Sequence, residues 1–492
     1  MTDLIFAKSV EGRQGAALPD LIVSDLKASQ CLPAEVLRPD PAALPELNEP
    51  EVIRHFTRLS QKNFSIDTHF YPLGSCTMKY NPRLCEDAAR LDGFASLHPL
   101  QDADDAAATL ELMARLEDWL CALCGTDAFT LTPAAGAQGE LCGMCIIQAY
   151  HVEREGKPRP LVLIPETAHG TNPASATLSG MTVKTIRTLA DGTTDLDDLD
   201  RNLDERVAGM MLTNPNTVGV FETRIVEIAE KVHAAGGLMY YDGANLNAIA
   251  GLSRPGDMGF DVVHLNLHKT FSTPHGGGGP GSGPVGVKSH LEPFLPVPCL
   301  VRDQAGRLSL TEDQPLTIGR LGTFQGNIGV AVRAFAYILL HGLEGLRRNS
   351  HLAVLNANYL RARLREHFRV PFAQHCMHEF VISLSDIAKQ TGVKAGDFAK
   401  RLLDYGHHAP TVYFPQIVPE CLLIEPTETE TRATLDTFAD AMIAIKNEAQ
   451  NDPDKVKTAP HSTPIGRLDE YRAATQLDCS CHGSTASQIS TR

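Results

Sequence analysis

Lys269 carries the amine that covalent chemistry on a carbonyl group needs. It follows the apolar run 261–265, which we expect to be a buried strand, and it precedes a glycine-rich tract that ends at Pro284. A lysine at the carboxyl edge of a parallel sheet stands where open α/β folds place their sites. Burial and a nearby cation favour loss of its proton, and the free amine can then form a Schiff base. Most lysines that follow a strand are solvated surface residues, so the neighbouring residues decide.

Asp242 is the second residue of interest, because it ends the strongly apolar run 238–241. A carboxylate buried there is unfavourable unless it meets a cation or hydrogen-bond donors. The protonated pyridine nitrogen of pyridoxal 5'-phosphate (PLP) is such a partner, and the pairing keeps the ring an effective electron sink. The alternative is an aspartate that caps the turn at Gly243 and Ala244. The combination of Asp242 with Lys269 favours a PLP enzyme in which Lys269 holds the cofactor as a Schiff base.

A phosphate site is expected at the small residues Ala135, Gly136 and Ala137, which open a predicted helix. Their free N–H groups would point at an anion with the helix dipole behind them, although a tight strand-to-helix turn needs the same residues. The segment 281–286 matches the dinucleotide pattern GxGxxG, but an apolar run follows it instead of a helix, so that match is weak. Glycines 276–279 would let the backbone pass close to a cofactor or a partner chain.

Two polar residues follow other predicted strands. His169 could stack on the open face of the cofactor ring, although a lone histidine is more often structural. Asn214 could approach the substituents of the ring, but it precedes Pro215, and the turn chemistry of an Asn-Pro pair explains it at least as well.

Charge and composition exclude several classes of protein. The 492 residues are 43% hydrophobic and 21% charged, as in ordinary globular proteins, and the net charge is −15, which disfavours a nucleic-acid partner. The N-terminus has neither an export signal nor a transit-peptide pattern, and no apolar run has membrane-spanning length. We therefore expect a cytoplasmic protein with reduced cysteines and no membrane partner.

Cysteine spacing offers a rival interpretation. Two pairs have the spacing of zinc ligands, with 17 residues between them: Cys121 with Cys124, and Cys142 with Cys145. Both pairs lie in apolar runs that we expect to be helical, so small buried cysteines explain them better. Cys479 and Cys481 in the polar tail are a weaker signal. We predict no metal site, and a zinc-stapled interaction subunit stays open as an alternative.

Alternation of short apolar runs with helical patterns predicts the fold. Buried strands are expected at 161–164, 209–212, 237–241 and 261–265. The helix at 225–232 lies between two of them and stops at Gly236. This strand–helix–strand pattern is typical of a mostly parallel sheet. After long helical patterns at 330–368, short strands at 380–384, 411–413 and 421–424 indicate a smaller α+β region. We predict an N-terminal arm (1–60), a large PLP-binding domain (61–330), a small domain (331–450) and a polar tail (451–492).

Five segments resemble the glycine decarboxylase P-protein family, the PLP component of the glycine cleavage system. They are residues 71–79, 166–174, 241–247, 264–284 and 424–428, in order along the chain. The family also exists as a single chain about twice this length, and this sequence is similar only to its lysine-bearing half. The resemblance therefore implies subunit 2 of the split form. It also implies a fold type I PLP enzyme with a large domain built on a mostly parallel, seven-stranded sheet.

The resemblance implies a role for each matching residue. Lys269 would hold PLP, His169 would stack on its ring, and Asp242 would pair with the ring nitrogen. Ala135, Gly136 and Ala137 would bind the phosphate. The substrate would lie near Ser75, Cys76 and Thr77, which could also form a purely structural turn.

The implied reaction is the decarboxylation of glycine with transfer of the aminomethyl group to the lipoyl arm of H-protein. This is an oxidoreductase acting on a CH–NH2 group with a disulfide acceptor. The implied partners are subunit 1, in a heterotetramer with two of each subunit, and lipoylated H-protein. The alternative within PLP chemistry is another fold type I enzyme that acts on a small amino acid. The sequence departs from the family at Gln325, where an aromatic residue is expected, and in the cysteine-containing tail.

Overall fold

The computed structural model describes residues 3–17, 27–40, 42–275, 281–372 and 375–477. Glycines 276–279, Cys479 and Cys481 lie outside these residues. The chain divides into two units, Met1–Ser65 and Ile66–Arg492. The elements of the first unit are η1 (Ile5–Lys8), α1 (Ala28–Cys31), η2 (Ala34–Val36) and α2 (Glu49–Ser60). The domain boundaries expected at residues 60, 330 and 450 stay predictions.

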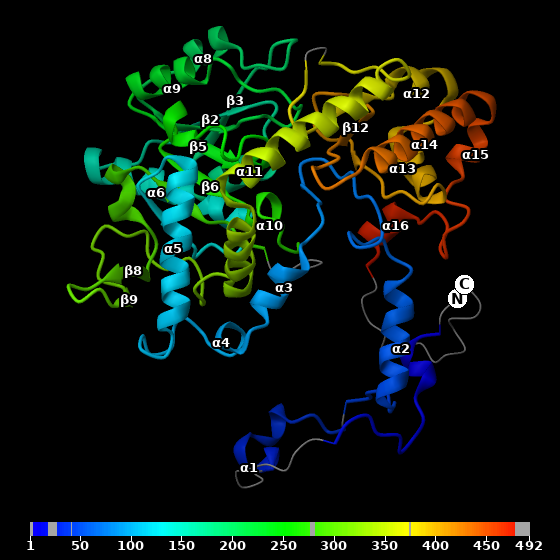
Figure 1. The fold of residues 1–492 in the computed structure, drawn as a ribbon, viewed down its shortest axis with the longest axis horizontal. Coiled ribbons are helices and arrows are strands. Elements are labelled where there is room, and N and C mark those ends of the chain that lie inside the picture. Colours follow the sequence, from blue (N-terminus) through cyan, green and yellow to red (C-terminus); the bar gives the residue numbers. More distant parts are fainter. Residues whose placement is uncertain (1–2, 18–26, 41, 276–280, 373–374, 478–492) are drawn as a thin grey trace. The chain divides into compact units, whose positions relative to one another are not determined.

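A seven-stranded sheet forms the centre of the second unit (Figure 1). From edge to edge its strands are β1 (Ala128–Thr130), β7 (Val285–Val287), β6 (Val262–Leu265), β5 (Leu238–Gly243), β4 (Val207–Thr213), β2 (Leu161–Pro165) and β3 (Thr182–Ile186). Strands β6, β5, β4, β2 and β3 are parallel, whereas β7 is antiparallel to both of its neighbours. The four strands expected from apolar runs correspond to β2, β4, β5 and β6, so the prediction of a mostly parallel sheet is confirmed.

Both faces of the sheet are covered, as the apolar character of its strands requires. The helices are α5 (Ala107–Cys124), α6 (Gly136–Glu155), α7 (Thr171–Leu178), α8 (Leu196–Asn202), α9 (Ile225–Ala234) and α10 (Leu267–Thr270). Met239 and Tyr241 of β5 pack in one hydrophobic cluster with α5 and α9, while Leu238 and Tyr240 pack in another with α6. This separation follows from the alternation of side chains along a strand.

The cysteine pairs with zinc-ligand spacing lie in two helices and do not meet. Cys124 of α5 and Cys142 of α6 belong to the hydrophobic clusters on opposite faces of the sheet. Across the described residues, no group of three metal-ligand atoms includes a cysteine. The structure therefore favours small buried cysteines over a zinc staple.

A long helix, α11 (Ile328–Leu364), leads from the sheet to the C-terminal region (Figure 1). Gly342 has non-helical backbone angles and kinks it, and the helix packs against α5 and α14. It is long and apolar enough to cross a membrane by length and composition alone, a test that core helices also pass.

The C-terminal region has its own three-stranded antiparallel sheet. Its strands, in spatial order, are β10 (Phe380–Ser383), β12 (Cys421–Ile424) and β11 (Thr411–Val412). Its helices are α12 (Ser385–Thr391), α13 (Ala395–Asp404), α14 (Arg432–Asn451), α15 (Pro453–Lys457) and α16 (Glu470–Thr475). A separate hydrophobic cluster joins this sheet to the second half of α11 and to α14. The region has the α+β character that the sequence predicts.

The remaining elements connect these parts. They are α3 (Arg83–Ala89), α4 (Asp92–Ala95), η3 (Leu246–Ala248), η4 (Pro255–Met258), η5 (Ser289–Phe294) and the hairpin of β8 (Cys299–Arg302) and β9 (Leu308–Thr311).

Gly143 lets α6 approach the sheet closely, because a Cβ at this position would lie 2.4 Å from the ring of Tyr240. Alanine normally favours a helix over glycine by about 1 kcal/mol. We expect Gly143→Ala to lower the free energy of unfolding by about 1–3 kcal/mol instead, as overpacking does. Urea denaturation measures the change. The matched control is Gly93→Ala in α4, where no atom lies within 4 Å; equal stabilisation by both substitutions would contradict the close packing.

Candidate active site

Parallel strands bring the predicted catalytic residues to one edge of the sheet. Lys269 lies in α10, directly after β6, and Asp242 lies near the end of β5. His169 follows β2. Because the carboxyl ends of parallel strands meet at the same edge, side chains from these three places share one environment. The positive charge of Lys269 acts on both of the others and lowers the pKa of His169 and of Asp242.

Asp242 is an ionised carboxylate inside the protein. It is 1% exposed, and its oxygens accept hydrogen bonds from Asn172 Nδ2 and from the N–H of Ala244, both at 3.0 Å. Burial by itself raises the pKa of Asp242, but His264, the bond from Asn172 and the charge of Lys269 together hold it below its ordinary value. The bond to Ala244 is the turn cap that the sequence offered as an alternative. Asp242 therefore caps the turn and also keeps a negative charge available for a cationic partner.

His264 is a second support of Asp242 that sequence reasoning missed. Its Nε2 lies 3.7 Å from Asp242 Oδ1, and its Nδ1 is hydrogen-bonded to the Tyr240 hydroxyl at 2.7 Å. Burial lowers the pKa of His264. The signal that could have found it is register, because Asp242 of β5 pairs directly with His264 of β6.

The segment predicted to lie near the substrate contacts Lys269 directly. Lys269 Nζ donates a hydrogen bond of 2.9 Å to the carbonyl oxygen of Ser75. Ser75 and Thr77 are buried and have positive φ angles of 64° and 49°, a strained conformation for residues other than glycine. Burial raises the pKa of the Cys76 thiol between them, and the charge of Lys269 offsets only part of that rise. The structure thus places a tight turn with a neutral thiol against the lysine.

Two carboxylates hold this turn. The N–H of Ser75 donates to Glu379 Oε2 at 2.7 Å, and the N–H of Thr77 donates to Glu425 Oε2 at 2.9 Å. Both glutamates are fully buried. The sequence assigned no role to either, because more than 300 residues separate them from the turn.

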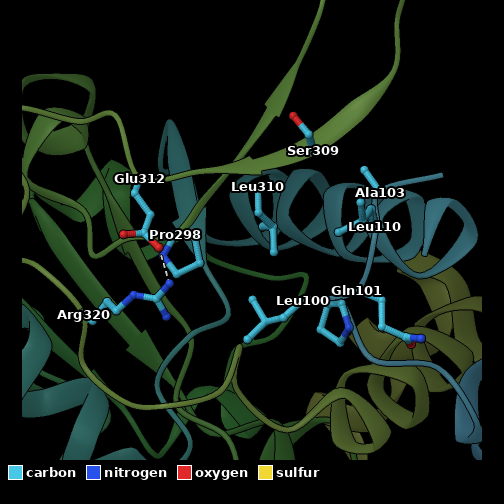
Figure 2. A pocket seen from close by; sticks show the side chains of 10 residues that line it. Leu100, Gln101, Ala103, Leu110, Pro298, Ser309, Leu310, Glu312 and Arg320 are labelled. Atoms are coloured by element: carbon cyan, nitrogen blue, oxygen red, sulfur yellow. Dashed lines mark hydrogen bonds and ion pairs between the residues drawn. The ribbon is translucent and has the colours of Figure 1, made fainter. Parts of the chain in front are cut away.

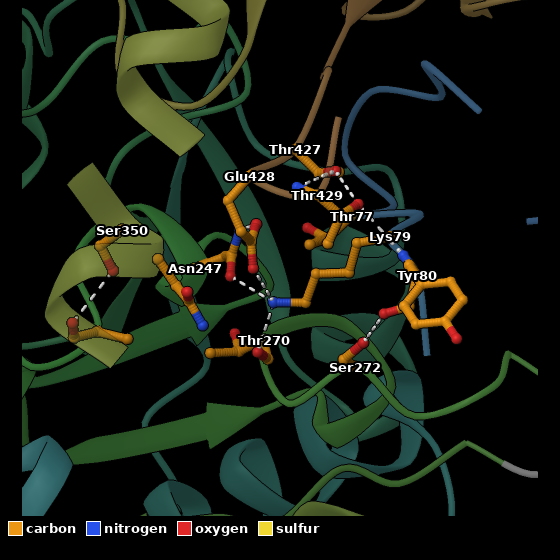
Figure 3. A network of polar contacts seen from close by, with 12 residues as sticks. Thr77, Lys79, Tyr80, Asn247, Thr270, Ser272, Ser350, Thr427, Glu428 and Thr429 are labelled. Atoms are coloured by element: carbon orange, nitrogen blue, oxygen red, sulfur yellow. Dashed lines mark hydrogen bonds and ion pairs between the residues drawn. The ribbon is translucent and has the colours of Figure 1, made fainter. Parts of the chain in front are cut away.

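A hydrogen-bond network around Lys79 connects the segment that contains the Ser75–Thr77 turn to α10, the helix that carries Lys269 (Figure 3). Lys79 Nζ donates to Glu428 Oε1 at 2.7 Å, to Asn247 Oδ1 at 2.8 Å and to the carbonyl of Thr270 at 2.8 Å. Burial lowers the pKa of Lys79, but Glu428 and the Tyr337 hydroxyl outweigh it and raise the pKa above its ordinary value. Four of the segments that carry the family resemblance therefore meet at this buried ion pair.

The start of α6 has the properties of an anion site. Ala135 is its N-cap in extended conformation and makes no side-chain cap bond, and Ala135 and Ala137 are exposed. The glycine between them is required by space, because a Cβ on Gly136 would lie 2.2 Å from Asn266 Nδ2. An uncapped N-terminus of a long helix presents free N–H groups and the positive end of the helix dipole. The predicted phosphate residues are thus open to a ligand and lack a competing protein cap.

His169 is connected to a buried acid. Its Nδ1 lies 2.9 Å from Thr171 Oγ1, which donates to Glu140 Oε1 at 2.7 Å. Burial lowers the pKa of His169, so its ring is neutral and suited to stacking. His169 also borders a hollow of about 550 Å³, whose lining includes Phe414. A second hollow, of about 370 Å³, is bordered by the ion pair Glu312–Arg320, and no predicted site residue lines it (Figure 2).

Asn214 makes its hydrogen bonds within its own loop. Its Oδ1 accepts the N–H of Glu222 at 2.9 Å, and its Nδ2 donates to the carbonyl of the same residue at 3.4 Å. The side chain is fully buried and both of its polar atoms contact the loop after β4. These bonds support the turn alternative, and a role for Asn214 at the cofactor stays a prediction.

Comparison with known proteins extends the resemblance to nearly the whole chain. The chain is 57% identical over 472 residues to the probable glycine dehydrogenase (decarboxylating) subunit 2 of Caldanaerobacter subterraneus subsp. tengcongensis, covering 96% of this chain and 97% of that protein. It is 57% identical over 478 residues to the protein of the same name from Methylococcus capsulatus, again covering 96% and 97%. The chain belongs to this family. A family model described as glycine dehydrogenase, C-terminal domain, matches residues 349–463 of this subunit 2 family member.

Solved structures show that the subunit 2 fold is fold type I. The structure is similar to a glycine decarboxylase (P-protein) of the glycine cleavage system in inhibitor-bound form, with a TM-score of 0.71 at 22% identity, covering 84% of this chain and 93% of that chain. A glutamate decarboxylase from Lactobacillus brevis gives a TM-score of 0.65 at 14% identity, covering 86% and 97%. The predicted fold class is confirmed.

Glu140 makes stability depend on pH. Burial and the nearby charge of Asp242 raise the pKa of Glu140 from 4.5 to about 7. A buried acid with a raised pKa binds its proton more tightly in the folded state, so its contribution is full below about pH 4.5 and is lost as the pH rises through 7. We expect Glu140→Gln to remove up to about 3 kcal/mol of this pH dependence. Urea denaturation between pH 5 and 8 measures it, and an unchanged slope would contradict a raised pKa.

Proposed function

We propose that this chain is the PLP-carrying subunit 2 of a split glycine dehydrogenase (decarboxylating). It decarboxylates glycine and passes the aminomethyl group to the lipoyl arm of H-protein. The observation that carries the proposal is the placement of Lys269 beside an ionised, buried Asp242 at the carboxyl edge of the sheet. That placement occurs in a chain 57% identical to glycine dehydrogenase (decarboxylating) subunit 2 over nearly its full length.

The residues present fit PLP at each point that the cofactor needs. Lys269 would hold it covalently, and Asp242 would pair with its ring nitrogen. Ala135, Gly136 and Ala137 would bind its phosphate at the uncapped start of α6, where a Cβ at position 136 would displace the side-chain amide of Asn266. His169 would stack on its ring. When bound, PLP supplies an electron sink for the pair that is left on the α-carbon of glycine.

The chain's own residues prepare the site for glycine. Lys269 must give up a proton before its amine can react, and the hydrogen bond to Ser75 holds the nitrogen in place until then. Asn172 and the N–H of Ala244 hold the carboxylate of Asp242 in one orientation. Ser75, Cys76 and Thr77, whose turn contacts Lys269, would also contact the substrate. Loss of CO2 requires that glycine be held in one orientation, and a rigid turn suits that task.

Partners and organisation follow from the family. The name subunit 2 implies a subunit 1, and we propose two copies of each in a heterotetramer that receives lipoylated H-protein. A cytoplasmic location stays a prediction. We also propose that residues 61–330 form the large PLP-binding domain and 331–450 the small one, with 1–60 as an arm and 451–492 as a tail. The separate hydrophobic cluster of the C-terminal region supports this division.

Exchange of labelled bicarbonate into glycine tests the reaction. With subunit 1 and lipoylated H-protein present, we expect exchange by the wild-type chain and a loss of at least about 1000-fold in Lys269→Ala, because the variant cannot hold the cofactor covalently. Lys184→Ala serves as the matched control, because Lys184 is exposed on the edge strand β3, and this variant should bind PLP. Absence of exchange by the wild-type chain would contradict glycine decarboxylation and favour another fold type I reaction.

A further inference from the structure

Two buried glutamates lie next to each other just beyond the ends of two neighbouring strands of the C-terminal sheet. Glu379 precedes Phe380 of β10 and Glu425 follows Ile424 of β12, the last residues that pair. One carboxyl oxygen of each lies within 4.8 Å of the other and of a ring nitrogen of His378. Both are 0% exposed. Like charges directly opposite destabilise a sheet, and two ionised carboxylates away from water are strongly unfavourable. The proposed reaction as described above gives this pair no task.

One oxygen of each carboxyl group is used to hold the turn over Lys269. Glu379 accepts the N–H of Ser75, and Glu425 accepts the N–H of Thr77. Because both turn residues have positive φ angles, these bonds hold a conformation that the backbone does not favour by itself. The pair therefore positions the carbonyl of Ser75 that meets the lysine.

The other oxygen of each carboxyl group contacts a group that has both a hydrogen-bond donor and an acceptor. Glu379 Oε1 accepts from Asn245 Nδ2 at 3.1 Å, while Asn245 Oδ1 is buried and has no partner among the described residues. A rotation of the Asn245 amide would turn that acceptor toward the glutamate. Glu425 Oε1 accepts from the Thr77 hydroxyl at 2.7 Å, and a hydroxyl can also accept. Glu425 can thus carry the proton and keep its bond to Thr77, whereas a proton on Glu379 would require the Asn245 amide to give up its 2.9 Å bond to the carbonyl of Pro215.

The titratable groups around Glu379 and Glu425 do not take up the proton that the raised pKa values of these two residues imply. The titratable groups that act on it are Lys269 of α10, Glu428 after β12, Cys76 of the turn and His378 before β10. His378 is fully buried, its Nε2 lies 3.8 Å from Glu425 Oε1, and burial lowers its pKa to about 3, so it stays neutral. Glu428 is paired with Lys79. Burial raises the pKa of Glu425 to about 7, and burial with the Glu425 charge raises that of Glu379 well above its ordinary value.

We propose that Glu379 and Glu425 share one proton, so that the pair presents a single negative charge to Lys269 while it holds the Ser75–Thr77 turn. This inference rests on the proposed function and deepens it. Two charges would hold Lys269 as an unreactive ammonium group and repel the carboxylate of glycine, whereas no charge would fail to stabilise the protonated nitrogen of the cofactor-bound lysine. Both glutamates are positioning residues, because they act through the turn and through Lys269.

Glutamine substitutions separate a shared proton from two independent charges. The variants are Glu379→Gln, Glu425→Gln and the double variant, in which each glutamine keeps a carbonyl oxygen that can accept the N–H of the turn. The matched control is Glu222→Gln, since Glu222 is also buried and accepts two backbone N–H bonds. Each full-length chain is produced together with subunit 1 and loaded with PLP. Two properties are measured: the pKa of the Lys269 nitrogen from the pH dependence of the cofactor absorption, and the infrared band of protonated carboxylic acid near neutral pH.

A shared proton predicts an unusual pattern. Each single variant should leave the pKa of the Lys269 nitrogen unchanged, because the remaining carboxyl ionises and the total charge stays at one. The double variant should lower that pKa by about 1–3 pH units, as loss of a close opposite charge does. The wild-type protein and Glu222→Gln should show more intensity in the infrared band of protonated acid than each single variant, by the amount of one acid, while Glu140 contributes to the band equally in all of them.

Stepwise lowering of the pKa in the two single variants would show two ionised carboxylates and overturn the proposal. So would an unchanged pKa in the double variant, or an infrared band of protonated acid that is equally intense in the wild-type protein and the single variants. If the double variant does not fold, the infrared comparison of each single variant with the wild-type protein still tests whether the two glutamates share a proton. It also needs no cofactor, so failure of the wild-type chain to bind PLP would contradict the proposed function and leave the test of the shared proton intact.

Discussion

The buried negative charge of Asp242 is the constraint around which the site is built. A carboxylate with 1% exposure persists only where hydrogen bonds and cations replace water. Here Asn172 and the backbone of Ala244 supply the hydrogen bonds, and Lys269 supplies the positive charge. Each of these partners comes from a different part of the large sheet or its loops. The parallel arrangement of β2, β5 and β6 is therefore what keeps the carboxylate ionised. An ionised Asp242 is in turn what allows a pyridine ring beside it to stay protonated.

A second constraint is that the lysine must be held without being neutralised permanently. Lys269 donates to the backbone carbonyl of Ser75, which is a weaker partner than a carboxylate. The carboxyl groups of Glu379 and Glu425 do not bind the lysine directly but hold the backbone N–H groups of the turn. Glu428, another carboxylate in this region, forms its ion pair with Lys79 and not with Lys269. A buried ion pair of this kind is weak evidence for stability, but together with its hydrogen bonds it fixes one arrangement of four distant segments. The division of labour leaves Lys269 able to react while the structure around it stays rigid.

Local sequence patterns were sufficient for the sheet and for the residues at its carboxyl edge. Strands β2, β4, β5 and β6 are continuous apolar runs, and Lys269, Asp242 and His169 follow or end three of them, so parallel topology alone brings them together. Register and long-range packing determine the rest. His264 supports Asp242 only because β5 and β6 pair in a particular register, and Glu379 and Glu425 reach the turn at residues 75–77 only after the C-terminal sheet has formed. Asn214 shows how a polar residue at a strand end can also serve its own loop, since its Oδ1 accepts the N–H of Glu222, and a strand-end position alone does not separate this task from a contact with the cofactor.

Identification of the lysine that carries the cofactor tests the central claim most directly. The chain is incubated with PLP, reduced with borohydride and digested, and the modified peptide is located by mass spectrometry. The account predicts a single phosphopyridoxyl group on Lys269 and no covalent label in the Lys269→Ala variant. A label on another lysine such as Lys288, or a wild-type chain without any label, would contradict it.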